Sequence, residues 1–132
     1  MEVEAGERIP VRFVLDNFNH AFYESVLGGK DNLFSVERAS RMPLISTLLE
    51  NSDSLRFFGK GDKRKGPNLR RCALIHEAYD FVLVLEFRLN KANQIAGRFI
   101  TCYRMSEPQT LGLIRSNGEW NIHVLRDELN QG

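Results

Sequence analysis

The segment from Lys60 to Arg71 gathers the side chains best suited to bind an anion. Its basic residues outnumber its single acid, Asp62, whereas the whole chain carries a net charge of only +1. Lysine acts as a point charge, arginine can bind a phosphate through two hydrogen bonds, and glycine lets the backbone approach a ligand closely. A solvated surface loop would have the same composition, so the pattern leaves two interpretations: an anion-binding loop or a charged loop without a ligand. The basic residues are Lys60, Lys63, Arg64, Lys65, Arg70 and Arg71.

Three histidines are candidates for proton transfer, because the ordinary pKa of histidine lies near neutrality. They are too dispersed to form a metal-binding motif, and no cysteine–histidine spacing favours zinc, so we expect neither a metal nor another cofactor. His20 lies off the apolar side of an expected helix, and His76 lies near the end of an expected strand. His123 falls in an expected late hairpin and is the weakest candidate. A structural role is the alternative for each of them.

Other familiar catalytic patterns are missing from the sequence. It contains neither the GxxxxGK[ST] pattern of a phosphate-binding P-loop nor the GxSxG pattern of a nucleophilic hydrolase. Glu77, Asp80 and Glu86 fall at expected strand ends and turns, where charges are commonly only solvated, so a paired-carboxylate glycosidase is not expected. Cys72 and Cys102 lie in apolar stretches, which favours two buried thiols, although a disulfide between adjacent strands stays open.

Apolar spacing predicts two helices in the first half of the chain. The first covers about Val11–Leu27 and is stopped by Gly28 and Gly29. The second covers Ser40–Asn51, with Pro43 in its first turn. Its buried side would consist of Leu44, Ile45, Leu48 and Leu49.

From Leu55 onward the pattern changes to strands. We expect a short strand at Leu55–Phe58, a mobile loop over the basic segment, and strands at Leu69–His76, Phe81–Phe87 and Ile95–Met105. The apolar run at Phe81–Phe87 would also suit a buried helix, but its β-branched content favours a central strand.

Alternation along the last of these strands predicts which side chains share a face. Thr101 and Tyr103 should point the same way, together with Phe99 and Met105. The other face would carry Arg98, Ile100, Cys102 and Arg104. Further along, Asn117–Gly118 between two apolar stretches predicts a type I′ β-hairpin.

Helices followed by consecutive strands predict an α+β fold, with two N-terminal helices packed on a four- to five-stranded antiparallel sheet. The length of 132 residues and the balance of 42% hydrophobic and 27% charged residues are typical of one globular domain, covering residues 1–132. No apolar run approaches the ~18 residues that a membrane span needs. The acidic start, Met1–Arg8, looks like a cut end, so we expect the domain to be the C-terminal payload of a longer protein.

Four segments together resemble the BECR fold family, which comprises the barnase, EndoU, colicin and RelE nucleases. The likeness is greatest to small versions in phage proteins and in polymorphic bacterial toxins, including those of contact-dependent growth inhibition. It covers about half of the chain and extends more weakly to the first expected helix through His20. The segments are Arg38–Asp53, Arg70–His76, Phe81–Arg88 and Phe99–Arg104.

The resemblance implies a metal-independent ribonuclease that often cuts tRNA. Members of the family have a functional histidine in the first helix, basic residues on the strand after the loop, and a Thr or Ser with a nearby Tyr on a later strand. The matching positions are His20, Arg71 with His76, and Thr101 with Tyr103. Many relatives have Lys or Arg where His76 stands, so its role as acid–base group or phosphate contact stays open.

The implied reaction is a transesterification. A base removes the proton of the ribose 2′-OH, the oxygen attacks the phosphate, and an acid protonates the departing 5′ oxygen, which leaves a 2′,3′-cyclic phosphate and a 5′-OH. His20 and His76 are the acid and base candidates. Arg71 would stabilise the charge on the phosphate, and Thr101 and Tyr103 would position it. The RNA backbone would be held by Lys60, Lys63, Arg64, Lys65 and Arg70.

The partners implied are RNA, a cognate immunity protein or antitoxin, and, as a further candidate, a host translation factor. The domain would act in the bacterial cytoplasm after secretion or delivery within a larger protein. Two alternatives remain: a noncatalytic RNA- or protein-binding module of the same fold, and an unrelated α+β interaction domain.

Overall fold

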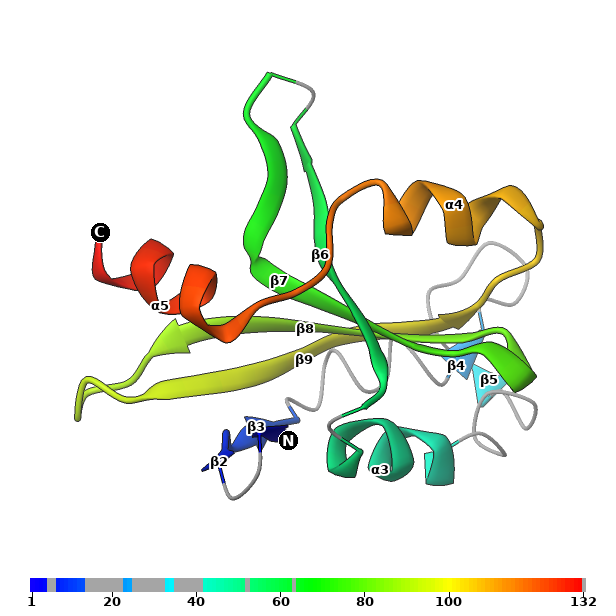
Figure 1. Ribbon diagram of the computed structural model, residues 1–132. Helices are drawn as coiled ribbons and strands as arrows, with labels where there is room; N and C mark the ends of the chain where they lie inside the picture. The colour runs from blue at the N-terminus through cyan, green and yellow to red at the C-terminus, as the bar shows by residue number, and fades with distance from the viewer. Residues whose placement is uncertain are drawn as a thin grey trace.

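The centre of the computed structural model is a five-stranded sheet in the order β3-β9-β8-β7-β6 (Figure 1). The structure describes residues 1–4, 7–13, 23–24, 33–34, 42–51, 53–62 and 64–131. Neighbouring strands of the sheet are antiparallel except β3, which is parallel to β9. The α+β class is therefore confirmed, but the expected purely antiparallel sheet is wrong. The strands are β3 (Val11–Arg12), β6 (Leu55–Asp62), β7 (Gly66–His76), β8 (Phe81–Leu89) and β9 (Ile95–Arg104).

Short elements and helices surround this sheet. Among the described residues, one helix precedes its long strands and two follow them, so the described helices are mostly C-terminal; most of the first expected N-terminal helix lies outside the described residues. No helix in these parts of the chain is long and apolar enough to cross a membrane. The paired short strands are β1 (Glu2–Glu4) with β2 (Glu7–Arg8), and β4 (Tyr23–Glu24) with β5 (Leu33–Phe34). The helices are α3 (Met42–Glu50), the 3-10 turn η1 (Glu77–Tyr79), α4 (Gln109–Arg115) and α5 (Ile122–Asn130).

Two short strands fall within the range Val11–Leu27 that was predicted to be a helix, and most of that range lies outside the described residues. Val11–Arg12 pairs with β9, and Tyr23–Glu24 pairs with β5. At the first end, Val11 packs against the core and the ring of Phe13 stacks on that of Phe99, with ring centroids 5.2 Å apart. Val11 and Phe13 are two positions apart, which is the spacing of a strand, whereas the apolar residues of the whole segment also fit a helical spacing.

The second predicted helix is confirmed as α3. Pro43 is its second residue, where a missing N–H costs no helical hydrogen bond. Its apolar side packs against the sheet as expected, with Ile45, Leu48 and Leu49 buried and Leu44 partly buried.

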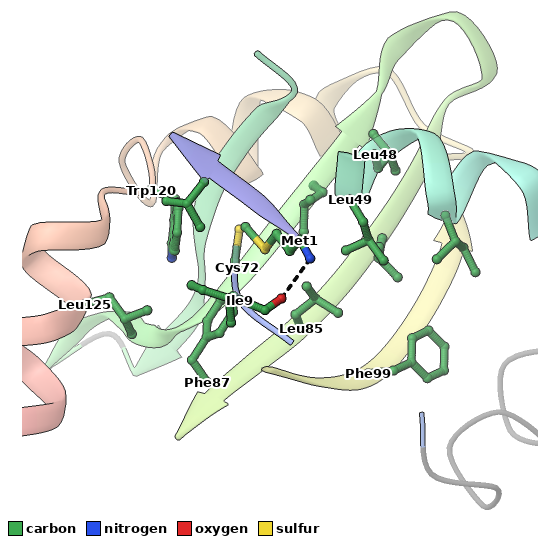
Figure 2. Close-up of a cluster of buried hydrophobic side chains, with 14 of the residues drawn as sticks. Met1, Ile9, Leu48, Leu49, Cys72, Leu85, Phe87, Phe99, Trp120 and Leu125 are labelled. Atoms are coloured by element: carbon green, nitrogen blue, oxygen red, sulfur yellow. Dashed lines mark hydrogen bonds between the residues drawn. The ribbon is translucent and has the colours of Figure 1, made fainter. Parts of the chain in front are cut away.

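The two faces of the sheet carry two separate apolar clusters. The first, which we call the core face, is covered by α3, α5 and the N-terminal segment (Figure 2). There the amino group of Met1 donates a hydrogen bond to the carbonyl of Ile9 at 2.8 Å. The opposite face, which we call the α4 face, is covered over one half by α4. The core face includes Cys72, Leu74, Leu83, Leu85, Phe87 and Phe99, and the α4 face includes Phe57, Ala73, Ile75, Val82 and Met105.

Both cysteines are buried and neither forms a disulfide, which confirms the simpler interpretation of the sequence. Cys72 lies on β7 and Cys102 on β9, so β8 runs between them and they are not neighbours on adjacent strands. Burial raises the pKa of the Cys72 thiol far above its ordinary value.

A β-bulge in β9 changes the faces on which its side chains lie. Thr101 pairs with Val84 but Phe99 pairs with Leu85, so Ile100 is an extra residue. Thr101 and Tyr103 do share a face, the α4 face, as predicted. Phe99, however, is in the core cluster with Cys102, and Arg98 is on the side of Thr101. The predicted sides of Phe99 and Arg98 are therefore wrong.

The basic segment belongs to a hairpin of two paired strands with irregular register, rather than to the expected loop. Strand pairing continues through Gly59 with Asn68 and Asp62 with Gly66, and this part projects beyond the rest of the sheet (Figure 1). We call the residues Gly59–Asp62 and Gly66–Arg70, with the turn between them, the arm. A Cβ atom at Gly59 would overlap the Cβ of Arg71, and one at Gly61 would overlap the carbonyl oxygen of Gly66. These glycines allow close strand contact and do not break the strands.

The predicted C-terminal hairpin is wrong, because helices α4 and α5 flank Asn117–Gly118. Gly118 has φ +92°, and its N–H donates to the carbonyl of Arg115, which ends α4. The Asn121 side chain then caps α5 by accepting hydrogen bonds from the N–H groups of His123 and Val124. Between the helices, Phe58 N–H donates to Gly118 and Trp120 N–H donates to Arg56, so residues 118–120 run along the outer edge of β6.

Two neighbouring residues of α5 test this helical assignment. Leu125 is fully buried in the core cluster, whereas Val124 is 38% exposed. We expect Leu125→Ala to lower the free energy of unfolding by about 2–5 kcal/mol and Val124→Ala to change it by less than about 0.5 kcal/mol. Urea denaturation followed by circular dichroism measures both. In the hairpin interpretation Val124 would share the buried side of Trp120 and Ile122, so the order of the two effects would be reversed.

Candidate functional site

Four basic side chains and one carboxylate form a row across the open half of the α4 face. Arg71 on β7 pairs with Glu86 on β8, Glu86 pairs with Arg98 on β9, and Arg98 pairs with Arg12 on β3. Arg88 lies two residues beyond Glu86 and therefore points to the same face. We call Arg12, Arg71, Arg88 and Arg98 with Glu86 the basic row. No described helix packs over it, because α4 covers the other half of this face.

Glu86 is the centre of the basic row. Its carboxylate lies 3.2 Å from Arg71 Nε, 3.0 Å from an Nη of Arg88 and 3.2 Å from an Nη of Arg98. The Glu86 side chain is only 12% exposed, whereas that of Arg88 is 70% exposed. Each guanidinium has five N–H donors, so one carboxylate cannot occupy them all. The row therefore has donors and positive charge left for an added anion.

The arginines also keep Glu86 ionised. Partial burial acts to raise the pKa of Glu86, but hydrogen bonds from Arg71 and Arg88, with the charges of both, outweigh this and lower the pKa below its ordinary value. The sequence interpretation that treated Glu86 as a solvated end residue is wrong. A usable signal was present: Glu86 stands between Leu85 and Phe87 in an apolar strand, where an ordinary surface charge is not expected.

Thr101 and Tyr103 continue from the basic row along the same face. They pair with Val84 and Val82, two and four residues from Glu86, which places them roughly 7 and 13 Å from the row along the strand direction. Tyr103 is 36% exposed, and its partial burial raises the pKa of its hydroxyl. The phenol therefore stays protonated at neutral pH and can donate a hydrogen bond.

The histidines do not join this group in the described part of the chain. His76 lies five residues after Arg71 on a regular stretch of β7 and pairs with Phe81, so it points to the core face. Its Nδ1 is buried without a hydrogen-bond partner, and its ring lies 5.1 Å from that of Tyr79. His20 lies outside the described residues. Of the predicted catalytic set, the structure brings together Arg71, Thr101 and Tyr103 and separates His76 from them.

The arm carries the remaining predicted RNA-binding residues. Lys60, Arg64 and Lys65 are exposed and form no ion pair with the described residues, and Lys63 lies outside these residues. Arg70 differs from them, because its Nε lies 3.7 Å from the Glu128 carboxylate on α5. The arm thus holds cations that have no described anionic partner.

A hollow of about 370 Å³ joins the arm to the basic row. It forms because β7 no longer pairs with β8 beyond Arg71 and Glu86. A larger hollow of about 540 Å³ lies between β2 and α5, but its arginines are already paired, Arg8 with Glu50 and Arg126 with Glu7. Arg70 and Arg88 of the smaller hollow are paired as well, with Glu128 and Glu86, but this hollow adjoins the basic row and the arm and is therefore the candidate anion site. It is lined by Asn68, Arg70, Glu86, Arg88, Leu89 and Leu129.

Comparison with known proteins adds no family to this geometry. No protein-family model matches the chain, and neither a curated protein nor a solved structure shows significant similarity to it. Within the described ranges, no group of three or more His, Cys, Asp and Glu side chains is placed to hold a metal ion. The function is therefore argued from the basic row and the arm.

The charge on Glu86 gives a pH-dependent stability. Because its pKa is lowered on folding from an ordinary value of 4.5, ionised Glu86 stabilises the fold above that pH, and this contribution is lost as pH falls through the lowered pKa. We expect Glu86→Gln to be less stable than the unchanged protein at pH 7, with the difference shrinking by pH 3. Urea denaturation at both pH values measures it.

Glu50→Gln is the control for this experiment. Its partner Arg8 also lowers the pKa of Glu50, but the two side chains are 57% and 49% exposed, so solvent screens the pair and the effect should be smaller. A stability difference for Glu86→Gln that does not change with pH would contradict the role assigned to the carboxylate.

Proposed function

We propose that this chain is a metal-independent endoribonuclease toxin that cleaves RNA, with tRNA as the expected substrate, by transesterification through the ribose 2′-OH. The observation that carries the proposal is the basic row, an ionised carboxylate among four arginines on an exposed sheet face. Arginine matches the geometry and charge of a phosphodiester, and an ionised carboxylate can accept a proton. Thr101 on the same face supplies a hydroxyl.

The residues of the α4 face support an assignment of roles. Glu86 takes the proton of the 2′-OH, and the oxygen then attacks the phosphorus. Arg71 and Arg98 turn from Glu86 to the phosphate oxygens and stabilise the charge that develops there. The departing 5′ oxygen takes a proton from an acid, for which His20 is the candidate implied by the family resemblance. A 2′,3′-cyclic phosphate and a 5′-OH remain.

This assignment replaces His76 by Glu86. Side chains on opposite faces of a sheet do not reach the same phosphate, and His76 points to the core face. Thr101 keeps its proposed role as a hydrogen-bond donor near the basic row. Tyr103, roughly 13 Å from the row, donates to a neighbouring part of the RNA, and the arm holds the RNA backbone away from the reacting bond.

Cleavage of tRNA in EDTA tests the proposal directly. We expect the purified protein to produce fragments that end in a 2′,3′-cyclic phosphate. Glu86→Gln keeps the shape of the side chain but removes the base, so it should lower the cleavage rate by roughly 10²- to 10⁴-fold. Single-turnover rates on end-labelled tRNA measure this loss.

Glu77→Gln is the matched control, because Glu77 also pairs with an arginine, Arg115, but lies in η1, outside the basic row and the arm. It should cut at the rate of the unchanged protein. His20→Ala should fold and bind RNA but cut slowly. Intact tRNA in every condition, including with added translation factors, would end the proposal.

A noncatalytic RNA-binding module is the second candidate. It is favoured by one observation: in the described part of the chain, no histidine lies on the α4 face with the basic row. Tight binding of tRNA without cleavage would select this function, and Glu86→Gln would then leave binding nearly unchanged.

The toxin part of the proposal predicts an effect in cells. Induced expression in bacteria should stop growth, because a ribonuclease that cuts tRNA blocks translation, and co-expression of a cognate immunity protein or antitoxin should restore it. Glu86→Gln, expressed to the same level, should be tolerated. Counts of viable cells after induction measure the effect. Normal growth with abundant folded protein would argue against a toxin acting in the bacterial cytoplasm.

A further inference from the structure

Unpaired positive charge is concentrated at the outer end of the arm. In the basic row, three arginines share Glu86, and beside it Arg70 faces Glu128. Lys60, Arg64 and Lys65 are exposed and have no ion pair among the described residues. An added anion gains most where positive charge is not already compensated, so the outer end of the arm attracts phosphate independently of the row.

Asp62 accepts two backbone hydrogen bonds in the turn at the end of the arm. The Asp62 carboxylate accepts a hydrogen bond from the N–H of Arg64 at 2.8 Å, and the Asp62 carbonyl accepts one from the N–H of Lys65 at 3.2 Å. Gly61 packs closely against Gly66 across the hairpin, with no room for a side chain between them. The one acid of the segment is therefore used to fix the turn, and the backbone positions of Arg64 and Lys65 relative to the sheet are set.

The end of the arm is too far from the basic row to contact the same phosphate. Gly59 lies against Arg71, and Asp62 is three residues further along β6, which corresponds to roughly 10 Å at the usual rise of a strand. Arg64 and Lys65 lie beyond that point. At ~3.4 Å per nucleotide along one stacked strand, this span corresponds to about three nucleotides.

We infer that the outer arm is a second phosphate-binding subsite, which engages the RNA backbone about three or more nucleotides away from the phosphate at the basic row. The inference rests on the proposed RNA site and specifies its substrate: an RNA strand long enough to reach both places. The hollow between Arg70 and Arg88 leads from the basic row to the base of the arm. A trinucleotide fills only the row, whereas a dodecanucleotide fills the row and the arm.

Binding of RNAs of two lengths tests this inference. The probes are a trinucleotide and a dodecanucleotide with 2′-O-methyl groups, which lack the nucleophile and are not cut. The double variant Arg64→Ala/Lys65→Ala should leave the affinity for the trinucleotide unchanged and lower the affinity for the dodecanucleotide. Loss of two phosphate contacts should reduce the slope of log K against log salt concentration by about 1.4 for the dodecanucleotide, at ~0.7 per contact with a single strand. Fluorescence anisotropy at several salt concentrations measures both quantities.

Two further variants complete the design. Arg98→Ala, in the basic row, should lower the affinity for both RNAs. Arg8→Ala/Arg115→Ala removes the same number of positive charges from sites away from the arm, where Arg8 pairs with Glu50 and Arg115 with Glu77. This variant should lower the affinity for both RNAs by the same small factor at most. This control separates a local subsite from the effect of net charge.

Other outcomes overturn the inference. If the arm variant lowers the affinity for both RNAs equally, the arm belongs to the primary site. If it lowers the affinity for neither RNA, the arm does not bind the strand. If the unchanged protein binds no RNA of either length, the inference fails together with the proposed function. If the length dependence holds but tRNA is not cut in EDTA, only the catalytic part of the proposed function is lost.

Discussion

A carboxylate in the most buried strand must be compensated, and the arrangement of the α4 face depends on this requirement. Glu86 lies on β8 between Leu85 and Phe87, both fully buried. A buried charge without partners is strongly unfavourable, and here the partners come from both neighbouring strands and from β8 itself. The same compensation that makes Glu86 tolerable thus places the arginines side by side around one carboxylate.

Much of the sheet was predictable because its strands are defined by local apolar runs. The runs at Leu69–His76, Phe81–Phe87 and Ile95–Met105 correspond to β7, β8 and β9 within a few residues. Helix α3 was predictable for the same reason, since its buried residues recur at one helical spacing. In these elements the local pattern and the tertiary packing favour the same structure.

The remaining elements depend on packing that no local pattern encodes. Glycines at positions 59 and 61 are typical of a loop, yet here they allow two strands to come close together. Asn117–Gly118 is typical of a tight hairpin, but its glycine ends α4 instead. Glycine offers both room for a close neighbour and freedom of φ, and the surrounding chain decides which of the two is used.

The candidate site was predictable only where a residue could be recognised by itself. Arg71, Thr101 and Tyr103 were named from the sequence and lie on one face. Arg98 was assigned to the wrong face, because its position depends on the bulge at Ile100. Arg12 and Glu86 join the row through strand register, which brings together residues that are more than seventy positions apart in the chain.

The segment between α4 and α5 has a consequence for self-association. Its hydrogen bonds to Arg56 and Phe58 occupy part of the outer edge of β6, at the side of the sheet where no further strand is paired in the described structure. A bare strand edge is a template on which another molecule can add a strand. The connection between the last two helices therefore also blocks intermolecular β-pairing at this edge. The tendency of the protein to aggregate should thus depend on the docking of its C-terminal helices.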